Sequence, residues 1–147
     1  MIEHNRSAPN ASVVPILVYD DVEMAIDFLC GAFGFTEHLR AARPDGRLIH
    51  AQLTFGDGGV IIGRAGGPFK APHGEGATHV VHVTVPDARE HCRQAREFGA
   101  HIVREPEEMP FGELQYTAED TAGRWWTFSE HVADVAPETW GATTAPR

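Results

Sequence analysis

The fold is constrained most by a period of 65 to 66 residues that relates the second half of the chain to the first. The period holds at the start of a helical pattern, at the glycine that ends this pattern, and at a glycine before the last apolar run. Three landmarks at one spacing indicate a supersecondary unit that is used twice. The matched pairs are Asp21 with Asp87, Gly34 with Gly99, and Gly58 with Gly123.

The first unit is predicted to contain a strand, a helix and three further strands. The strands are predicted at short apolar or alternating runs, over 13–19, 36–41, 48–55 and 60–64. Asp20 and Glu23 have the spacing of a capping box, and Gly34 suits the left-handed end of a helix. The predicted apolar face of this helix consists of Val22, Ile26, Leu29 and Phe33, which recur at helical spacing.

The second unit repeats this order. Strands are predicted over 78–85, 101–104, 114–117 and 124–129, with a helix over 87–98. Asp87 and Glu90 again have capping-box spacing, and Gly99 ends the helical pattern. The predicted apolar face of this helix is Ala88, Cys92, Ala95 and Phe98. The predicted fold class is therefore α+β, with tandem β-α-β-β-β modules.

The domain boundaries follow from these landmarks. One domain, residues 13–131, would hold both modules (13–64 and 78–131), joined by a glycine- and proline-rich linker at 65–77. We expect residues 1–12 to form a flexible arm and residues 132–147 to form a tail. Trp140 leaves two alternatives for the tail, a mobile terminus or a segment whose indole docks on the body of the protein.

Composition argues against several function classes. The formal net charge is −9, and no basic stripe is present with which to bind nucleic-acid phosphates. No apolar run approaches the roughly 20 residues of a membrane span, and residues 1–12 lack the pattern of a secretory signal. Cys30 and Cys92 both lie in predicted helices and are expected to be buried thiols rather than a disulfide. These features predict a cytoplasmic protein without nucleic-acid or membrane partners.

Five segments carry a resemblance to a known family. They are 21–29 (Asp-Val-Glu-Met-Ala-Ile-Asp-Phe-Leu), 33–35 (Phe-Gly-Phe), 85–88 (Val-Pro-Asp-Ala), 98–100 (Phe-Gly-Ala) and 119–125 (Glu-Asp-Thr-Ala-Gly-Arg-Trp). With its paired modules, the chain resembles the vicinal oxygen chelate superfamily, which includes glyoxalase I, extradiol dioxygenases and bleomycin-resistance proteins. The similarity covers about residues 13–131 and is closest to bacterial glyoxalase-like proteins of undefined activity. One departure is Asp120-Thr121-Ala122-Gly123, where the family usually has Asp-Pro-x-Gly.

The resemblance also implies where a metal would bind. Metal-dependent members take His, Glu or Gln ligands from the first and last strands of each module. None of the four residues that the landmarks place there is a usual ligand for zinc, nickel or iron. These residues are Val14, Ile62, Val80 and Thr127. We therefore predict no metal and no other cofactor.

Histidines elsewhere give a weaker alternative for a metal site. His79 and His82 lie three residues apart on a predicted strand, so their side chains face opposite sides and form a poor chelating pair. His50 and His82 would have to converge from neighbouring strands.

The resemblance further implies a curled sheet in each module, with a helix on the outer face and a ligand cavity on the inner face. Side-chain alternation then leaves Trp126 and Phe128 for the core of the second module. A cavity with an indole, imidazoles and aliphatic walls suits a flat, partly aromatic ligand. An equally open alternative is that Trp125 packs in the core and the histidines only bind backbone groups. The candidate ligand-binding residues are His50, Gln52, Ile62, Arg64, Val80, His82, Thr84, Phe111, Tyr116, Trp125 and Thr127.

Two function classes remain open. The favoured one is a metal-independent small-molecule-binding protein of the bleomycin-resistance type, which sequesters an aromatic or conjugated compound. The alternative is a lyase, isomerase or dioxygenase on the same frame, with non-standard metal ligands or with acid–base catalysis by His82 or His50. Because the frame hosts both classes, the fold does not choose between them. We also expect a homodimer, because cavities in this superfamily are often completed across a module interface.

Overall fold

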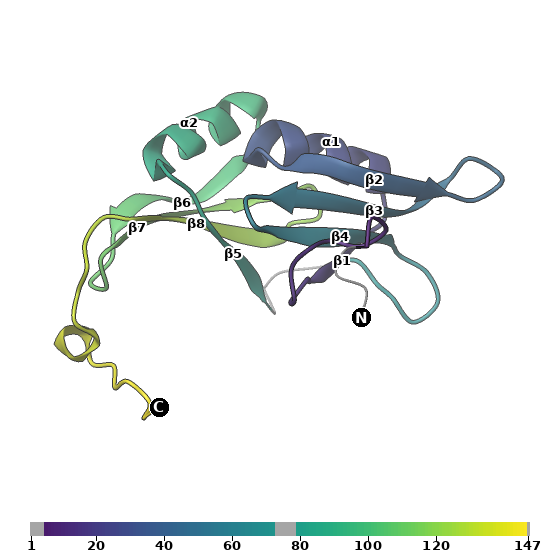
Figure 1. Cartoon of the computed structure of the whole chain (residues 1–147). Coiled ribbons are helices and arrows are strands. Elements are labelled where there is room, and N and C mark those ends of the chain that lie inside the picture. Colours follow the sequence, from purple (N-terminus) through teal and green to yellow (C-terminus); the bar gives the residue numbers. More distant parts are fainter. Residues whose placement is uncertain (1–4, 73–78, 147) are drawn as a thin grey trace. The chain divides into compact units, whose positions relative to one another are not determined.

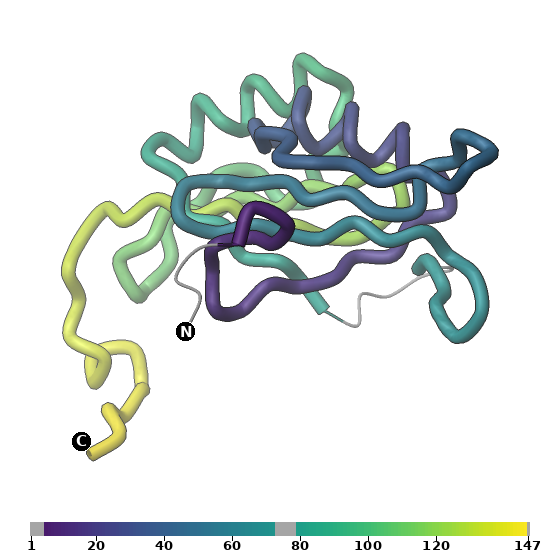
Figure 2. The backbone as a smooth tube through the Cα atoms, turned by 45° about the vertical axis from the view of Figure 1, so that its right-hand side comes forward, coloured from purple at the N-terminus to yellow at the C-terminus, as the bar shows by residue number. Residues whose placement is uncertain are grey.

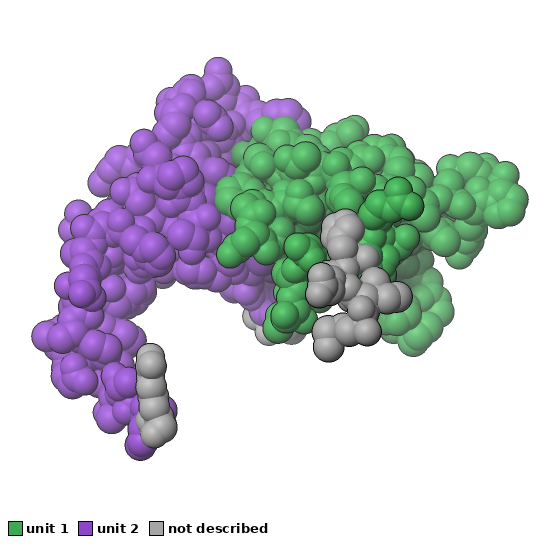
Figure 3. All heavy atoms as spheres, in the orientation of Figure 1, with its two compact units in different colours: residues 1–76, 120–124 green, residues 77–119, 125–147 purple. Residues whose placement is uncertain are grey.

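The computed structural model describes residues 5–72 and 79–146. The chain divides into two compact units, shown in different colours in Figure 3. Unit 1 comprises residues 1–76 together with 120–124, and unit 2 comprises residues 77–119 and 125–147. Each unit is built on one four-stranded mixed sheet, so the fold class is α+β as predicted.

Unit 1 contains the first module. Its sheet has the strand order β1-β4-β3-β2, in which β1 is parallel to β4 and the other pairs are antiparallel. The helix α1 lies on one face of this sheet (Figure 1). The elements are β1 (Ile16–Tyr19), α1 (Val22–Phe33), β2 (Thr36–Ala42), β3 (Leu48–Phe55) and β4 (Gly58–Arg64).

Unit 2 contains the second module and repeats this topology. The strand order is β5-β8-β7-β6, again with one parallel pair, β5 with β8. The helix α2 packs on one face of the sheet (Figure 1). The elements are β5 (Val80–Thr84), α2 (Ala88–Phe98), β6 (His101–Glu108), β7 (Glu113–Glu119) and β8 (Trp125–His131). The prediction of tandem β-α-β-β-β modules is confirmed.

Both helices begin at an aspartate cap. The carboxylate of Asp21 accepts a hydrogen bond from the backbone N–H of Met24 at 2.9 Å. The cap of α1 is therefore Asp21, and the prediction of Asp20 was wrong by one residue. At α2 the carboxylate of Asp87 accepts from the N–H of Glu90 at 3.0 Å, as predicted. Such caps satisfy N–H groups that a helix start otherwise leaves without partners.

Each helix ends at the predicted left-handed glycine and buries an apolar face. The buried residues of α1 are Val22, Ala25, Ile26, Leu29, Ala32 and Phe33. Those of α2 are Ala88, Cys92 and Ala95. Phe98 is 53 % exposed, so its prediction as a core residue was wrong. Phe98 lies ten residues after Ala88, whereas Phe33 lies eleven residues after Val22, so Phe98 is turned by about 100° around the helix from the equivalent position.

The turn before the last strand differs in length between the two modules, and this changes which residues of β4 and β8 correspond. His82 pairs with Thr127 between β5 and β8, and Ile16 pairs with Ile61 between β1 and β4. Both members of the second-module pair lie 66 residues after their counterparts, so Ile61 corresponds to Thr127. The sequence-based match of Gly58 with Gly123 instead made Ile62 the counterpart of Thr127. A slip of one residue sends a side chain to the opposite face of a sheet.

Strand β6 of unit 2 is longer than predicted. β6 continues through Pro106 to Glu108, beyond the predicted end at residue 104. Proline is tolerated here because β6 is an edge strand, where a missing N–H leaves no ladder bond broken. The pairing also shifts between Arg104 and Glu107, which places Pro106 in an irregular stretch of the ladder.

Residues 120–124 follow β7 in the chain and belong to unit 1, where the buried carboxylate of Asp120 holds them by hydrogen bonds. Asp120, fully buried, accepts the hydroxyl of Tyr19 at 2.5 Å and the backbone N–H groups of Ala122 and Arg124 at 2.9 and 3.0 Å. The Arg124 guanidinium lies 3.6 Å from the same carboxylate and 4.7 Å from the centre of the Tyr19 ring. It also donates to the carbonyl of Val18 at 3.3 Å. The buried charges are thus paired and hydrogen-bonded, as burial requires.

The C-terminal segment leaves β8 beside the turn between β6 and β7 (Figure 1). The N–H groups of Val132 and Ala133 both donate to the carbonyl of Gly112, at 2.9 and 3.1 Å. A short 3-10 helix, η1 (Pro137–Trp140), follows, and its last residue contacts the ring of Phe111 with 5.5 Å between centroids. Within the described residues, no helix has the length and apolar character to cross a membrane.

We predict that Trp126 is a main source of stability in unit 2. Its side chain has no exposed area and stacks with Phe128 at 6.4 Å between ring centroids. Trp126→Ala should lower the free energy of unfolding by about 3–5 kcal/mol, because it removes buried area and leaves a cavity. The exposed Phe98 is the control, since Phe98→Ala should change stability by about 0.5 kcal/mol or less. Equal losses in urea denaturation would contradict the assignment of faces.

Both tyrosines should stay protonated for as long as the protein is folded. Burial, and next the charge of Asp120, raises the pKa of Tyr19 well above its usual value, and burial also raises the pKa of Tyr116. Above the unfolded pKa of about 10 the unfolded chain loses these protons first, so stability falls as the pH rises. Tyrosinate absorbance and loss of the circular dichroism signal should therefore appear together. Ionisation of a phenol while the protein keeps its native circular dichroism would contradict this. In the Tyr19→Phe variant, the tyrosinate absorbance reports Tyr116 alone.

Candidate functional site

Strand register separates the unit 2 sheet into two faces. The face that contacts α2 carries Leu114, Tyr116, Ala118, Trp126 and Phe128. We call the opposite face the helix-free face of unit 2. It carries Val80, His82, Thr84, Glu113, Gln115, Thr117, Glu119, Trp125, Thr127, Ser129 and His131. The alternation predicted for β5 and β8 is the one observed, with Trp125 and Trp126 on opposite faces.

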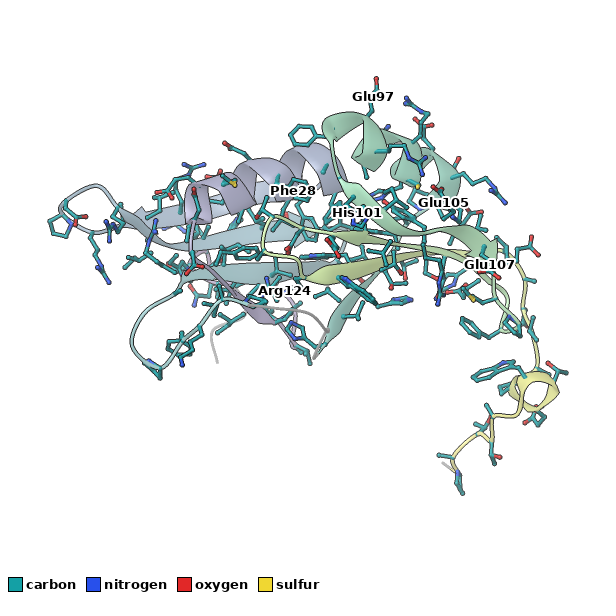
Figure 4. All side chains as sticks on the ribbon, turned by 180° about the vertical axis from the view of Figure 1, so that it is seen from behind. Phe28, Glu97, His101, Glu105, Glu107 and Arg124 are labelled. Carbon is teal, nitrogen blue, oxygen red and sulfur yellow. The ribbon has the colours of Figure 1, made fainter. Side chains whose placement is uncertain are left out.

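Trp125 is held on this face by a carboxylate. Its indole N–H donates to Glu119 at 3.1 Å, and the side chain is half-buried. The other carboxylate oxygen of Glu119 lies 3.3 Å from the imidazole of His101, which begins β6 (Figure 4). One strand pair further along, the hydroxyls of Thr117 and Thr127 lie 3.0 Å apart. The indole therefore has a defined orientation, with polar groups beside it.

A second polar group lies at the far end of β7 and β8. Gln115 donates to the Ser129 hydroxyl at 3.1 Å, and Ser129 donates to Glu113 at 3.1 Å. The remaining oxygen of Glu113 lies 2.5 Å from Nδ1 of His131. Serine, glutamate and histidine are present, but the carboxylate stands between the other two. A nucleophilic serine needs the histidine as its own partner, so this order activates no nucleophile.

The residues at the family's metal positions are not metal ligands. In unit 2 these positions hold Val80 and Thr127, and the equivalent of Thr127 in unit 1 is Ile61. Among the described residues, no group of three or more His, Cys, Asp and Glu side chains is placed to hold a metal ion. The donor set therefore does not fit the zinc, nickel or iron that metal-dependent relatives would hold.

In unit 1, the sheet face opposite α1 is likewise called its helix-free face. It carries two of the predicted site residues, His50 and Gln52. They pair with Gly63 and Ile61 of β4, respectively. The Gln52 amide lies 3.0 Å from Nε2 of His50 and donates to the carbonyl of Ser7 at 2.9 Å. Gln52 is only 3 % exposed, because the N-terminal segment, dark purple in Figure 2, lies against it. A ligand would reach His50 more readily than Gln52.

Two predicted site residues of unit 1 lie on the sheet face that α1 covers. Ile62 has no exposed area and pairs with Leu17 and Ala51 on the side that α1 covers. The guanidinium of Arg64 donates to the carbonyls of Leu48 and Asp20, at 2.5 and 2.9 Å, and binds Glu23 of α1 at 3.0 Å. Both assignments followed from the one-residue error in β4, and both side chains stabilise unit 1 itself.

Two aromatic candidates of unit 2 also lie away from the helix-free face. Tyr116 is fully buried under α2, where its hydroxyl lies 2.5 Å from Nδ1 of His91 and its ring stacks on Phe128. Phe111 belongs to the turn between β6 and β7 and contacts Trp140. The structure therefore brings together Val80, His82, Thr84, Trp125 and Thr127 from the predicted set.

Sequence reasoning missed the carboxylates that orient this face. Glu119 lies two residues beyond the predicted end of its strand, and Glu113 lies one residue before its start. Extending the alternation of Thr117 in both directions along β7 would have placed both carboxylates beside β8. No local sequence signal identified His101 or His131 as their partners, because these contacts join residues on different strands.

Comparison with known proteins places this geometry in a family. The sequence profile described as the Glyoxalase/Bleomycin resistance protein/Dioxygenase superfamily matches residues 11–128. The chain belongs to this superfamily. An uncharacterised protein of Mycobacterium tuberculosis (strain ATCC 25618 / H37Rv) is 34% identical over 127 residues, which cover 82% of this chain and 75% of that protein. The resemblance inferred from the sequence is confirmed.

Solved structures of the superfamily share the fold. The crystal structure of TioX from Micromonospora sp. ML1 is 34% identical, with a TM-score of 0.70 over 83% of this chain and 100% of that chain. A glyoxalase/bleomycin resistance protein/dioxygenase from Nocardioides has a TM-score of 0.65 at 18% identity, over 86% and 87% of the two chains. At that identity the second similarity concerns the fold alone.

Proposed function

We propose that the protein binds an aromatic or conjugated small molecule on the helix-free face of unit 2, without a metal, and sequesters it unchanged. The observation that carries this proposal is the half-buried indole of Trp125, held by Glu119 at 3.1 Å on the sheet face opposite α2. An oriented indole offers a flat ligand a stacking surface at little cost in side-chain entropy.

The neighbours of Trp125 suit the remaining edges of such a ligand. Val80, directly opposite Trp125 on β5, is 44 % exposed and offers apolar contact. His82 lies opposite Thr127, so an imidazole and a hydroxyl stand side by side as hydrogen-bonding groups. His50 belongs to the sheet of unit 1 and stays a predicted ligand-binding residue in its own right.

Sequestration without a metal is favoured by the chemistry of the residues. Valine and threonine occupy the metal positions of the second module, and neither supplies imidazole, carboxylate or thiolate. Serine, glutamate and histidine at the end of β7 and β8 are connected in an order that activates no hydroxyl.

An enzyme on the same frame is the second candidate function. Nδ1 of His131 lies 2.5 Å from Glu113, and this pairing orients the imidazole. His82 and His50 are the other imidazoles that acid–base catalysis would use. This candidate differs from sequestration in one observable respect, because the bound compound would be converted.

Binding is tested with bleomycin and a panel of planar aromatic compounds, screened by native mass spectrometry. For compounds that bind, Trp125→Ala should weaken affinity by about ten- to a hundredfold, because the stacking surface is lost. Prior dialysis against EDTA should leave affinity unchanged. Mass analysis of the compound after incubation should return it intact, and a new product would favour the enzyme.

His101→Ala is the matched control for Trp125→Ala. It removes the exposed partner of Glu119 and leaves the hydrogen bond between Glu119 and the indole in place, so affinity should change by about threefold or less. A Trp125→Ala variant that binds the same compounds with unchanged affinity would refute the site.

We further propose a homodimer. β1 and β5 are edge strands of their sheets, and each exposes an apolar side chain, Ile16 at 61 % and Val80 at 44 %. Exposed apolar edges favour association with a second chain. Sedimentation should give twice the chain mass of 16.1 kDa at tens of micromolar. Ile16→Lys should shift the protein toward monomer, whereas Met24→Lys, on the exposed side of α1, should not. A monomer for the unaltered chain would contradict the proposal.

We propose that the protein is cytoplasmic. Both cysteines are free thiols, Cys30 half-buried and Cys92 buried. Burial raises the pKa of each thiol, which lowers its reactivity. Unpaired thiols of this kind suit a reducing compartment.

A further inference from the structure

A pocket lies in unit 2 at the C-terminal tail, at the end of β8 that carries His131, whereas Trp125 begins this strand. Its volume is about 670 Å³, within the range of pockets that hold small molecules. It is lined by Phe111, Glu113, His131, Val132, Ala133, Asp134, Val135 and Trp140. We propose that this tail pocket is a separate binding site for an organic cation with an apolar body.

The wall formed by the tail is held in place by specific contacts. Val132 and Ala133 donate their N–H groups to the carbonyl of Gly112, at 2.9 and 3.1 Å. Gly112 has φ +82°, and a Cβ at this position would overlap the carbonyl of Ala133. Glycine is therefore required both for the turn and for the close approach of the tail. These contacts hold residues 132–133 against the turn between β6 and β7.

The pocket combines aromatic rings with negative charge. Phe111 and Trp140 stand 5.5 Å apart between ring centroids at an angle of 59°, so two ring surfaces are offered. Glu113 and Asp134 bring two carboxylates, and neither lysine nor arginine is among the lining residues. Aromatic faces and carboxylates both attract cations, whereas an anion would meet repulsion without a balancing guanidinium or ammonium.

The carboxylates add a preference among cations. Glu113 and Asp134 both line the pocket, and carboxylate oxygens accept hydrogen bonds from N–H groups. Two carboxylates favour an ammonium that carries N–H groups over a quaternary ammonium that carries none. The chemical class is therefore an arylalkyl or alkyl primary amine in its protonated form.

The test uses three probes that share a phenyl ring and differ in charge: phenethylammonium, 2-phenylethanol and 3-phenylpropionate. Binding is followed by the indole N–H resonance of Trp140 in a nitrogen-15 correlation spectrum of the full chain. Phenethylammonium should shift this resonance in a saturable manner and bind about tenfold more tightly than the alcohol, with 3-phenylpropionate weakest. Equal affinities for the three probes, or no shift of Trp140, would overturn the site.

Variants separate this site from the one proposed around Trp125, at the other end of β8. Asp134→Asn should weaken phenethylammonium about three- to tenfold, and Trp140→Ala should weaken it further, with affinity restored by Trp140→Phe. Because the two Trp140 variants lack the indole, their affinities are read from the backbone N–H resonances of Val132 and Ala133 in the same spectrum. Trp125→Ala should leave phenethylammonium binding unchanged. If Asp134→Asn and Trp140→Ala have no effect, the tail pocket is not the site, whatever the outcome of the Trp125 experiment. If Trp125→Ala abolishes the Trp140 shift, the cation binds at Trp125 instead and the proposal fails.

Discussion

Burial of one sheet face beneath each helix is the constraint on which the rest of the structure depends. An amphipathic helix and an alternating strand must bring their apolar sides together, so the side chains left on the other face are fixed as well. In unit 2 this places Trp126 and Phe128 under α2 and leaves Trp125 and Thr127 on the helix-free face. The chemistry available to a ligand is therefore a consequence of how the core is packed.

The sequence was sufficient for the architecture because the helix ends carry local signals. Asp87 and Gly99 act within a few residues of their own position, and a cap or a left-handed turn needs no distant partner. The faces of β5 and β8 also followed, since polar and apolar residues alternate cleanly there. In β4 the run Val60, Ile61 and Ile62 is apolar on both faces, so alternation gave no register and the turn glycines gave a wrong one.

The candidate site was predicted less completely because its order comes from contacts across strands and loops. The orientation of Trp125 depends on Glu119, and burial of Gln52 depends on the carbonyl of Ser7, 45 residues away in the sequence. The tail pocket joins the turn at Phe111 to Trp140, and no sequence period relates these two residues. Such contacts are properties of the folded chain and have no signature in a single segment.

The buried carboxylate of Asp120 has a consequence for how the two modules depend on one another. Unit 1 is not one continuous stretch of chain, because residues 120–124 complete it only after most of the second module has been made. When the first module has just been synthesised, the hydroxyl of Tyr19 and the carbonyl of Val18 still lack their partners, Asp120 and Arg124. Although the two modules repeat one topology, the first module cannot complete its hydrogen bonding until residues 120–124 have been synthesised.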